Sequence, residues 1–221
     1  MNKKQINLLW AKHNTQLLIL LHHIFLIGGI SYYGFNLLYF VLFYSIAMLY
    51  AWLVSSEIGH YHFAHGKYYD STKNYFYSVL LLLSGLGSPI SFSLMHRLHH
   101  RYVDTDRDPH SPKHIGWLRT YFLFWNTNNI TVNVIKDLIT SKFQLFIHNN
   151  RFLLHVLILI ILACIDVRIV CFLISSIVVY TFHTSGAINV FGHSNGQPRN
   201  APEVIWMQFW GWKHYVHHLN K

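Results

Sequence analysis

The stretch LLILLHHIFLIGGISYYGFNLLYFVLFYSIAMLYAWLV, residues 17–54, holds two apolar runs with a short break between them. A helix needs about 20 apolar residues to cross a hydrocarbon core roughly 30 Å thick. The runs at about 16–34 and 37–55 approach that length, and only SYYGFN separates their apolar centres. The sequence therefore predicts two membrane-spanning helices joined in a tight hairpin.

A second apolar pair follows at about 152–166 and 168–183, split by Asp166, Val167 and Arg168. Each run is short for a span, so we expect two thin or tilted helices rather than one interrupted helix. Composition agrees, because 52% of the 221 residues are hydrophobic and only 11% are charged. Such a balance excludes an ordinary soluble enzyme. The net charge of +9 is scattered among apolar runs, so no nucleic-acid partner is expected.

Histidines carry the chemical signal, since the chain has 18 of them. The pattern H-x-x-H-H occurs at His96, His99 and His100, and at about 100° per residue a helix turns all three rings to one face. The same pattern recurs at three later positions: His214, His217 and His218. Two one-sided triads are difficult to explain by packing alone and predict metal ligands.

An earlier cluster, GHYHFAH, contains His60, His62 and His65. On a regular helix His60 and His65 lie about 140° apart, so pairing them requires a helix end or local unwinding. His62 and His65, three residues apart, would share a face without distortion. The clusters together offer more imidazoles than one ion can bind, and no thiolate lies among them, which favours a pair of metal ions. Downstream of the first triad, Asp104, Asp108 and His110 can accept or donate the outer hydrogen bonds that orient ligating rings.

The number of membrane crossings between the histidine clusters constrains the segment at about 75–95. The segment is long enough to cross but contains Gly85, Gly87 and Pro89. A single crossing there would put the first two histidine clusters on opposite sides of the bilayer. The segment is therefore predicted to be interfacial or re-entrant. On this topology 16 of the 17 Lys and Arg residues lie on one face, leaving Arg168 on the other, and the positive-inside tendency makes that face cytoplasmic. The predicted fold is an all-α membrane protein of about four transmembrane helices in two hairpins with a cytoplasmic-side, histidine-rich, metal-binding cap.

The motifs GHYHFAHGK, HRLHHRYVDTDRDPHSP, INVFGH and HYVHH, in this order and interleaved with two hairpins, resemble the membrane-bound acyl-CoA and acyl-lipid desaturases. The resemblance implies one fatty acid desaturase domain over residues 1–221. Matched position by position, it implies nine histidine ligands and one asparagine that binds through water: His60, His65, His96, His99, His100, His193, His214, His217, His218 and Asn189. Four further side chains are expected to support these ligands without binding metal: His62, Asp104, Asp108 and His110.

The resemblance also implies a reaction. It is the oxygen-dependent introduction of a cis double bond into an acyl chain linked to CoA, acyl carrier protein or a lipid, by way of two iron ions. No catalytic residue beyond the metal ligands and no organic cofactor motif is expected. Electrons would come from an external ferredoxin or b-type cytochrome, and the membrane would be a bacterial inner membrane or the endoplasmic reticulum, with the metal site facing the cytoplasm.

Three alternatives stay open. The same ligands would serve a di-iron membrane hydroxylase of an acyl chain, sterol or carotenoid, although the D-x-x-x-D-P-H run after His100 favours a desaturase. A catalytically weakened, metal-binding paralogue is the second, because WGWK before His214 and LNK after His218 depart from the family pattern. A metal transporter is disfavoured, because most clusters lie beyond the span ends.

Overall fold

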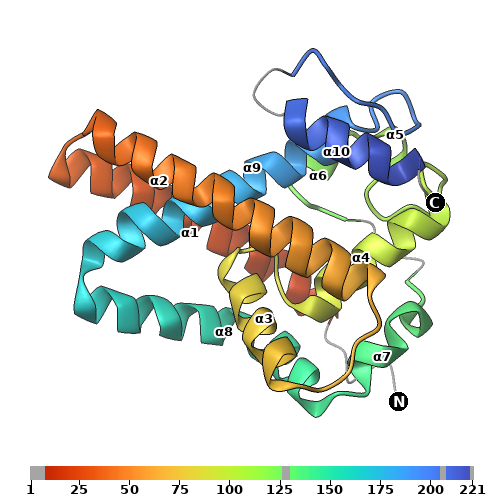
Figure 1. The fold of residues 1–221 in the computed structure, drawn as a ribbon, viewed down its shortest axis with the longest axis horizontal. Coiled ribbons are helices and arrows are strands. Elements are labelled where there is room, and N and C mark those ends of the chain that lie inside the picture. The colour runs from red at the N-terminus through yellow and green to blue at the C-terminus, as the bar shows by residue number, and fades with distance from the viewer. Residues whose placement is uncertain (1–7, 126–129, 205–207, 220–221) are drawn as a thin grey trace. The chain divides into compact units, whose positions relative to one another are not determined.

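Residues 8–125, 130–204 and 208–219 are described by the computed structural model, and all regular elements within them are helices (Figure 1). In chain order the elements are α1 (Leu8–Tyr33), α2 (Leu37–Tyr50), η2 (Ala51–His65), α3 (Thr72–Leu83), α4 (Pro89–Tyr102), α5 (Pro112–Ile115), α6 (Trp117–Tyr121), η3 (Val132–Ile135), α7 (Lys136–Ile139), α8 (Lys142–Ile165), η4 (Ile169–Ile174), α9 (Ser175–Phe191) and α10 (Gln208–Leu219). The chain divides into two compact units. Unit 1 comprises Met1–Leu94 and Ile135–Phe182, and unit 2 comprises Met95–Val134 and His183–Lys221.

Four helices in the described chain are long and apolar enough to cross a membrane: Thr15–Tyr33, Leu37–His65, Lys142–Ile165 and Ile169–Phe191. The prediction of an all-α membrane protein with four such helices is confirmed. Three of the helices extend well beyond the predicted apolar bounds, because backbone hydrogen bonding continues past the point where the side chains become polar. Large apolar side chains are exposed along these helices, as expected of surfaces that face lipid, and Leu38 and Ile165 are 73% and 71% exposed.

Short loops join the helices within each pair. Gly34 adopts a φ of +82°, and the Asn36 side chain then accepts a hydrogen bond from the Tyr39 amide, which caps α2. In the second pair, Asp166 ends α8 and forms an ion pair with Arg168 at 2.6 Å. These two polar loops fix the sharp reversals of a largely apolar chain.

The helix that begins at Leu37 changes its hydrogen-bonding pattern part-way along. Residues Ala51–His65 form a π-helix of 15 residues, in which each amide bonds the carbonyl five positions back. Such helices are rare and occur mostly as single turns at functional sites. A long π-helix therefore draws attention to its last residues, which include His60 and His65.

The ambiguous segment at 75–95 consists of two helices rather than one. α3 ends at Leu83 and α4 begins at Pro89, and between them Gly85 and Gly87 adopt φ values of +79° and +99°. These left-handed conformations suit glycine, and proline suits the first turn of α4. Whether the segment dips into the bilayer stays a prediction.

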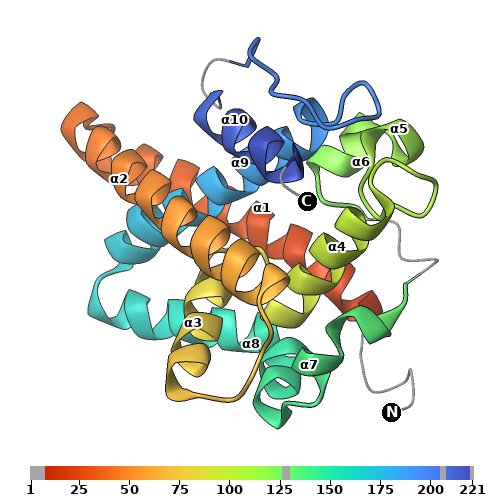
Figure 2. The ribbon, with the colours of Figure 1, turned by 45° about the vertical axis from the view of Figure 1, so that its right-hand side comes forward.

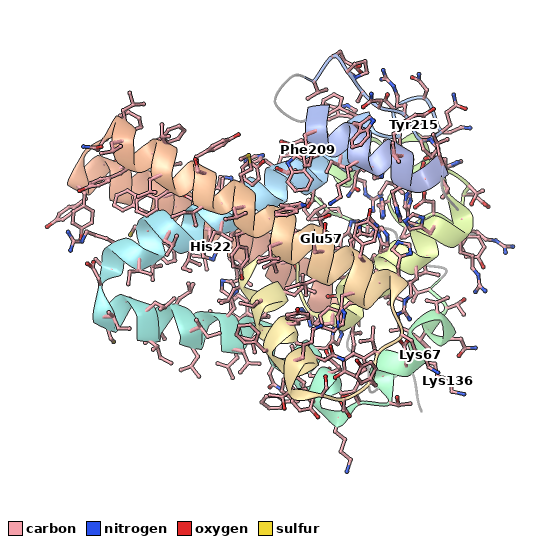
Figure 3. All side chains as sticks on the ribbon, in the orientation of Figure 1. His22, Glu57, Lys67, Lys136, Phe209 and Tyr215 are labelled. Atoms are coloured by element: carbon pink, nitrogen blue, oxygen red, sulfur yellow. The ribbon has the colours of Figure 1, made fainter. Side chains whose placement is uncertain are left out.

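The core of unit 1 contains polar contacts between helices. α3 packs on α8 (Figure 2), where the Gln144 amide donates to Ser78 Oγ at 2.7 Å and Tyr68 Oη at 3.0 Å. His22, labelled in Figure 3, is fully buried, and its Nε2 lies 2.9 Å from Nε2 of His155, which is also fully buried. A hydrogen bond between two fully buried side chains thus links α1 to α8.

In unit 2 a glycine brings α6 against α9. The Gly186 Cα lies so close to the Tyr121 carbonyl that an added Cβ would be 2.5 Å from that oxygen. The Tyr121 hydroxyl lies 2.8 Å from His183 Nδ1 on the same face of α9. This packing orients the end of α9, from which the chain turns to His193.

Candidate metal centre

The two predicted triads occupy helix ends in unit 2. His96, His99 and His100 lie in the last two turns of α4, and the ring centroids of His96 and His100 are 4.2 Å apart. In α10 the ring centroids of His214 and His218 are 4.5 Å apart. The i, i+3, i+4 spacing thus turns each set of rings to one side of its helix, as predicted.

Four imidazoles from three elements converge in unit 2: His99, His193, His214 and His218, with one ligating atom of each within 4.8 Å of the others. His193 Nε2 lies 3.3 Å from His214 Nε2, which lies 3.1 Å from His218 Nε2. His193 follows the end of α9 and is 1% exposed, and His99 is 2% exposed. Two of the four rings are therefore enclosed while His214 and His218 are half-buried, and all four donors are of one chemical type.

These distances fit a metal ion. Two imidazole nitrogens bound at about 2.1 Å to one ion, at angles between octahedral and tetrahedral, are separated by about 3.0–3.4 Å. His99 Nε2 is buried and has no hydrogen-bond partner. A buried nitrogen without a partner is costly, and a bound cation would satisfy it. The four-histidine set therefore has both the nitrogen–nitrogen spacing and the unpartnered nitrogen lone pair of a metal site.

Two carboxylates hold the outer nitrogens of this set. Asp104 Oδ2 accepts from His193 Nδ1 at 2.8 Å, and Asp108 Oδ2 accepts from His99 Nδ1 at 2.8 Å. Because each Nδ1 carries the proton, each Nε2 keeps its lone pair for a ligand. The sequence predicted that Asp104 and Asp108 would orient ligating rings, and both accept hydrogen bonds from predicted ligands, although metal binding by these rings stays a prediction. It could not predict which aspartate serves which ring.

The loop that carries the carboxylates stabilises their positions. Asp104 has a φ of +56°, and its amide donates to Asp108 Oδ2 at 2.9 Å. Sequence reasoning missed two further contacts: Ser111 Oγ donates to Asp104 Oδ1 at 2.8 Å, and His114 Nε2 donates to the Asp104 carbonyl at 2.9 Å. A single serine before a short helix, or a single histidine within one, gives no sequence signal for such a role.

Burial and hydrogen bonds together determine the charge states around the set. Burial raises the pKa of Asp108 to about 6, although the backbone amides of His110 and Asp104 act in the opposite direction. For Asp104 burial raises the pKa as well, but hydrogen bonds from His193 and Ser111 outweigh it, so the pKa lies below its usual value. Burial, with neighbouring imidazoles, lowers the pKa of His218 to about 3. The His218 ring is thus neutral, which is the form that binds metals.

A second group in unit 2 comprises His96, His100 and His217, again with one ligating atom of each within 4.8 Å of the others. His100 Nε2 and His217 Nε2 are 3.2 Å apart, within the separation derived above for two ligands of one ion. The two triads therefore each divide between two groups. His99 faces one group, while His96 and His100 face the other.

The first histidine cluster lies in unit 1, at the end of η2. The ring centroids of His60 and His65 are 4.9 Å apart, because residues five apart lie one above the other in a π-helix. The π-helix supplies the local unwinding that this pair requires. His62 turns elsewhere: its Nε2 lies 2.6 Å from Asn74 Oδ1, while Asn74 Nδ2 donates to the Tyr69 carbonyl. His62 Nε2 thus donates its proton to Asn74 of α3.

Two further predicted residues are His110 and Asn189. His110 stacks on His99 with ring centroids 4.2 Å apart, and its backbone amide donates to Asp108 Oδ1 at 3.1 Å. Asn189 lies on α9 one turn before His193 and is half-buried. Because His99 Nδ1 is bonded to Asp108, the close approach of His99, Asp108 and His110 is an outer hydrogen-bonding arrangement rather than another metal site.

Curated proteins with similar sequences are named as desaturases or as desaturase-like proteins. The chain is 31% identical over 139 residues to icosanoyl-CoA 5-desaturase of Limnanthes douglasii. The aligned residues cover 59% of this chain and 39% of that protein. It is 38% identical over 86 residues to delta-9 desaturase-like 2 protein of Arabidopsis thaliana, covering 37% and 28% of the two chains. It is 36% identical over 74 residues to the chloroplastic palmitoyl-monogalactosyldiacylglycerol delta-7 desaturase of Arabidopsis thaliana, covering 31% and 20%.

The chain is thus similar in sequence, over part of its length, to proteins named as fatty acyl desaturases. It spans well under half of the length of the curated desaturases named above. No family model and no solved structure matches it. The histidine groups of this chain could hold metal ions.

Proposed function

We propose that the chain provides the catalytic core of an oxygen-dependent fatty acyl desaturase that introduces a cis double bond through two iron ions. One observation carries the proposal most directly. His99, His193, His214 and His218 converge from separate segments, and buried aspartates orient two of the four rings. The apolar helices and the desaturase relatives support an acyl chain as the substrate.

The proposed ligand sets follow the two groups. One ion is held by His99, His193, His214 and His218. The other is held by His96, His100 and His217. His60 and His65 are further proposed ligands, because the resemblance to the desaturases implies them. Asn189 would bind through a water molecule. The π-helical juxtaposition of His60 and His65 supports their acting together.

The protein's own contribution is orientation and protection. Asp104 and Asp108 keep protons on the outer nitrogens of His193 and His99, so that the inner nitrogens stay available as donors. Burial of His99 and His193 excludes water from the ligands. The iron pair would supply the activation of O₂ that breaking unactivated C–H bonds requires. The balanced reaction removes one hydrogen from each of two adjacent methylenes and, with two external electrons and two protons, reduces O₂ to two water molecules.

The partners remain proposals. A ferredoxin or b-type cytochrome would supply electrons at the cytoplasmic face, where the positive-inside tendency places the metal site. Lys3, Lys4 and Lys221, which contribute to that charge, lie outside the described residues. The acyl carrier is CoA, acyl carrier protein or a lipid, in a bacterial inner membrane or the endoplasmic reticulum. Relatives named for a CoA ester and for a galactolipid support both kinds of carrier.

Expression in a desaturase-deficient host tests the proposal. The membrane lipids should gain a mono-unsaturated acyl chain when the wild type is expressed. His217→Ala should abolish this product, whereas His23→Gln, a change in α1 at a ring bonded to the Ile19 carbonyl, should not. A hydroxylated chain in place of the double bond would identify a hydroxylase. Unchanged lipids from a chain that carries about two irons would refute desaturation.

A further inference from the structure

Helix α6 and the residue after it present an apolar surface next to a polar loop. Between residues 101 and 114 every exposed side chain is polar or charged. From residue 117 to 122 three of the four exposed side chains are large and apolar. They are Trp117, Leu118 and Phe122, which are 61%, 52% and 44% exposed and together form the α6 patch. Leu118 and Phe122 are four residues apart and therefore share one side of the helix.

Another side of α6 packs on the end of α9 (Figure 1). The Tyr121 carbonyl lies against Gly186, and the Tyr121 hydroxyl lies 2.8 Å from His183 Nδ1. Thr120 is fully buried, and its Oγ1 donates to the Gly116 carbonyl at 3.0 Å. Packing therefore determines which side of α6 is turned outward.

The contact with α9 gives the depth of α6 in the membrane. Gly186 belongs to the candidate span Ile169–Phe191, which follows the loop with the exposed ion pair of Asp166 and Arg168. A charged pair of this kind belongs at a membrane surface. Gly186 follows Ile169 by 17 positions, so at 1.5 Å per residue it lies no more than about 26 Å along the span. The hydrocarbon core is roughly 30 Å thick, so α6 meets the span near the opposite edge of that core.

The residue types of α6 suit this depth. Tryptophan is enriched where hydrocarbon meets headgroups, and arginine keeps its charge in the headgroup layer while its aliphatic stem lies on apolar surface. Arg119, which lies between the apolar residues, is exposed. A segment of this composition beside a membrane span is surrounded by lipid rather than by water.

We propose that α6 is an interfacial membrane anchor. The α6 patch inserts among the first acyl carbons of one leaflet, and the Arg119 guanidinium binds lipid phosphates. The anchor is joined to the candidate metal centre through α5, which contacts α6 and whose His114 donates to the Asp104 carbonyl at 2.9 Å. Asp104 in turn accepts from His193 Nδ1, so the depth of α6 sets the depth of the loop that orients this ring. The proposal needs only the fold and does not depend on the proposed desaturase activity.

Nitroxide labels measure the depth of α6 in vesicles of phosphatidylcholine and phosphatidylglycerol. The full chain, with both native cysteines replaced, carries one label at a time at a patch position or at an exposed polar control position: Cys164→Ser and Cys171→Ala throughout, with Leu118→Cys, Phe122→Cys, Thr105→Cys or Lys113→Cys. An unchanged thermal unfolding midpoint shows that a labelled variant is folded. Collision of the label with O₂, which concentrates in lipid, and with a water-soluble nickel chelate gives the depth of the label.

The labels at positions 118 and 122 should lie about 5–10 Å below the lipid phosphates, and the two control labels should lie above the phosphates. Equal exposure of all four labels to the nickel chelate would place α6 in water and overturn the proposal. Labels at 118 and 122 that neither reagent reaches would show a protein cover, from a second copy of the chain or from another protein, and would overturn it equally.

Oxidation of the unsubstituted chain by hydroxyl radicals gives a second test, in which no variant can misfold. Tyr69, which is 66% exposed in the polar loop before α3, should be oxidised readily in the same vesicles. Trp117 has a similar exposed fraction in the protein alone, but lipid should protect it. Mass spectrometry of the peptides measures both rates, and equal oxidation of Trp117 and Tyr69 would contradict the anchor.

Discussion

Replacing Asp108 by asparagine should weaken the four-histidine metal site far more than the same change at Asp104. Asp108 accepts hydrogen bonds on both oxygens: His99 Nδ1 and the Asp104 amide donate to Oδ2, and the His110 amide donates to Oδ1. In either orientation of an asparagine, its NH₂ group faces another donor. Such an unsatisfied contact costs about 1–3 kcal/mol in a buried site.

At Asp104 the same change can be accommodated. Oδ2 accepts from His193 Nδ1, and Oδ1 accepts from the hydroxyl of Ser111. An asparagine can keep its carbonyl oxygen on His193 and donate its NH₂ to Ser111 Oγ, because a hydroxyl can rotate and accept. The ring of His193 therefore keeps its orientation, and only the negative charge of the carboxylate is lost.

Metal affinity measured on purified protein distinguishes the two variants. Loss of a hydrogen-bonded partner of a ligating histidine lowers metal affinity about 10–100-fold, which is the expected result for Asp108→Asn. Asp104→Asn should lose less than about tenfold on the same scale. The assay is competition with a chelator, read by elemental analysis and by the absorption of substituted cobalt, so it does not depend on turnover. Equal losses, or a larger loss at Asp104, would refute the hydrogen-bond assignment.

Three further predictions concern stability. Gly186→Ala should lower the free energy of unfolding by about 1–3 kcal/mol, because its Cβ would meet the Tyr121 carbonyl. Gly28→Ala, with open space around the Cα, should not lower it. Thermal unfolding of the two variants checks this, and equal midpoints would contradict it. His22→Leu and His155→Leu should each destabilise the protein by about 1–3 kcal/mol, since each leaves the other ring's nitrogen buried without its partner. The double variant should lose less stability than the sum of the two single losses. An additive result would show that the contact contributes nothing. Chelation of metal should lower the thermal unfolding midpoint, because an ion present at about 100 times its Kd stabilises the protein by about 2.7 kcal/mol. In His214→Ala chelation should lower the midpoint less. An equal decrease in the variant would place the metal elsewhere.

The sequence was sufficient to predict the helical membrane fold because the lengths of apolar runs directly reflect bilayer thickness. The ends of the helices were predicted less well. η2 extends to His65 and α8 begins at Lys142, since backbone hydrogen bonds continue through polar residues that a hydropathy pattern assigns to loops.

The triads at His96 and His214 were visible from spacing alone, because they fit the period of a regular helix. The pair His60 and His65 does not fit that period, and a regular helix would pair His65 with His62. The π-helix changes the outcome, and no simple sequence pattern predicts one. The sequence could not predict which ring each of Asp104 and Asp108 contacts. Two carboxylates in one loop can contact either ring until the backbone of Asp104 adopts its left-handed conformation.

The iron content of the purified full chain tests the central claim most directly. Elemental analysis after expression in iron-replete medium should find about two iron ions per chain, and Asp108→Asn, with its weakened four-histidine group, should retain about one. A wild type that binds one ion or none, or an Asp108→Asn variant that keeps both as tightly as the wild type, would contradict the two-iron account.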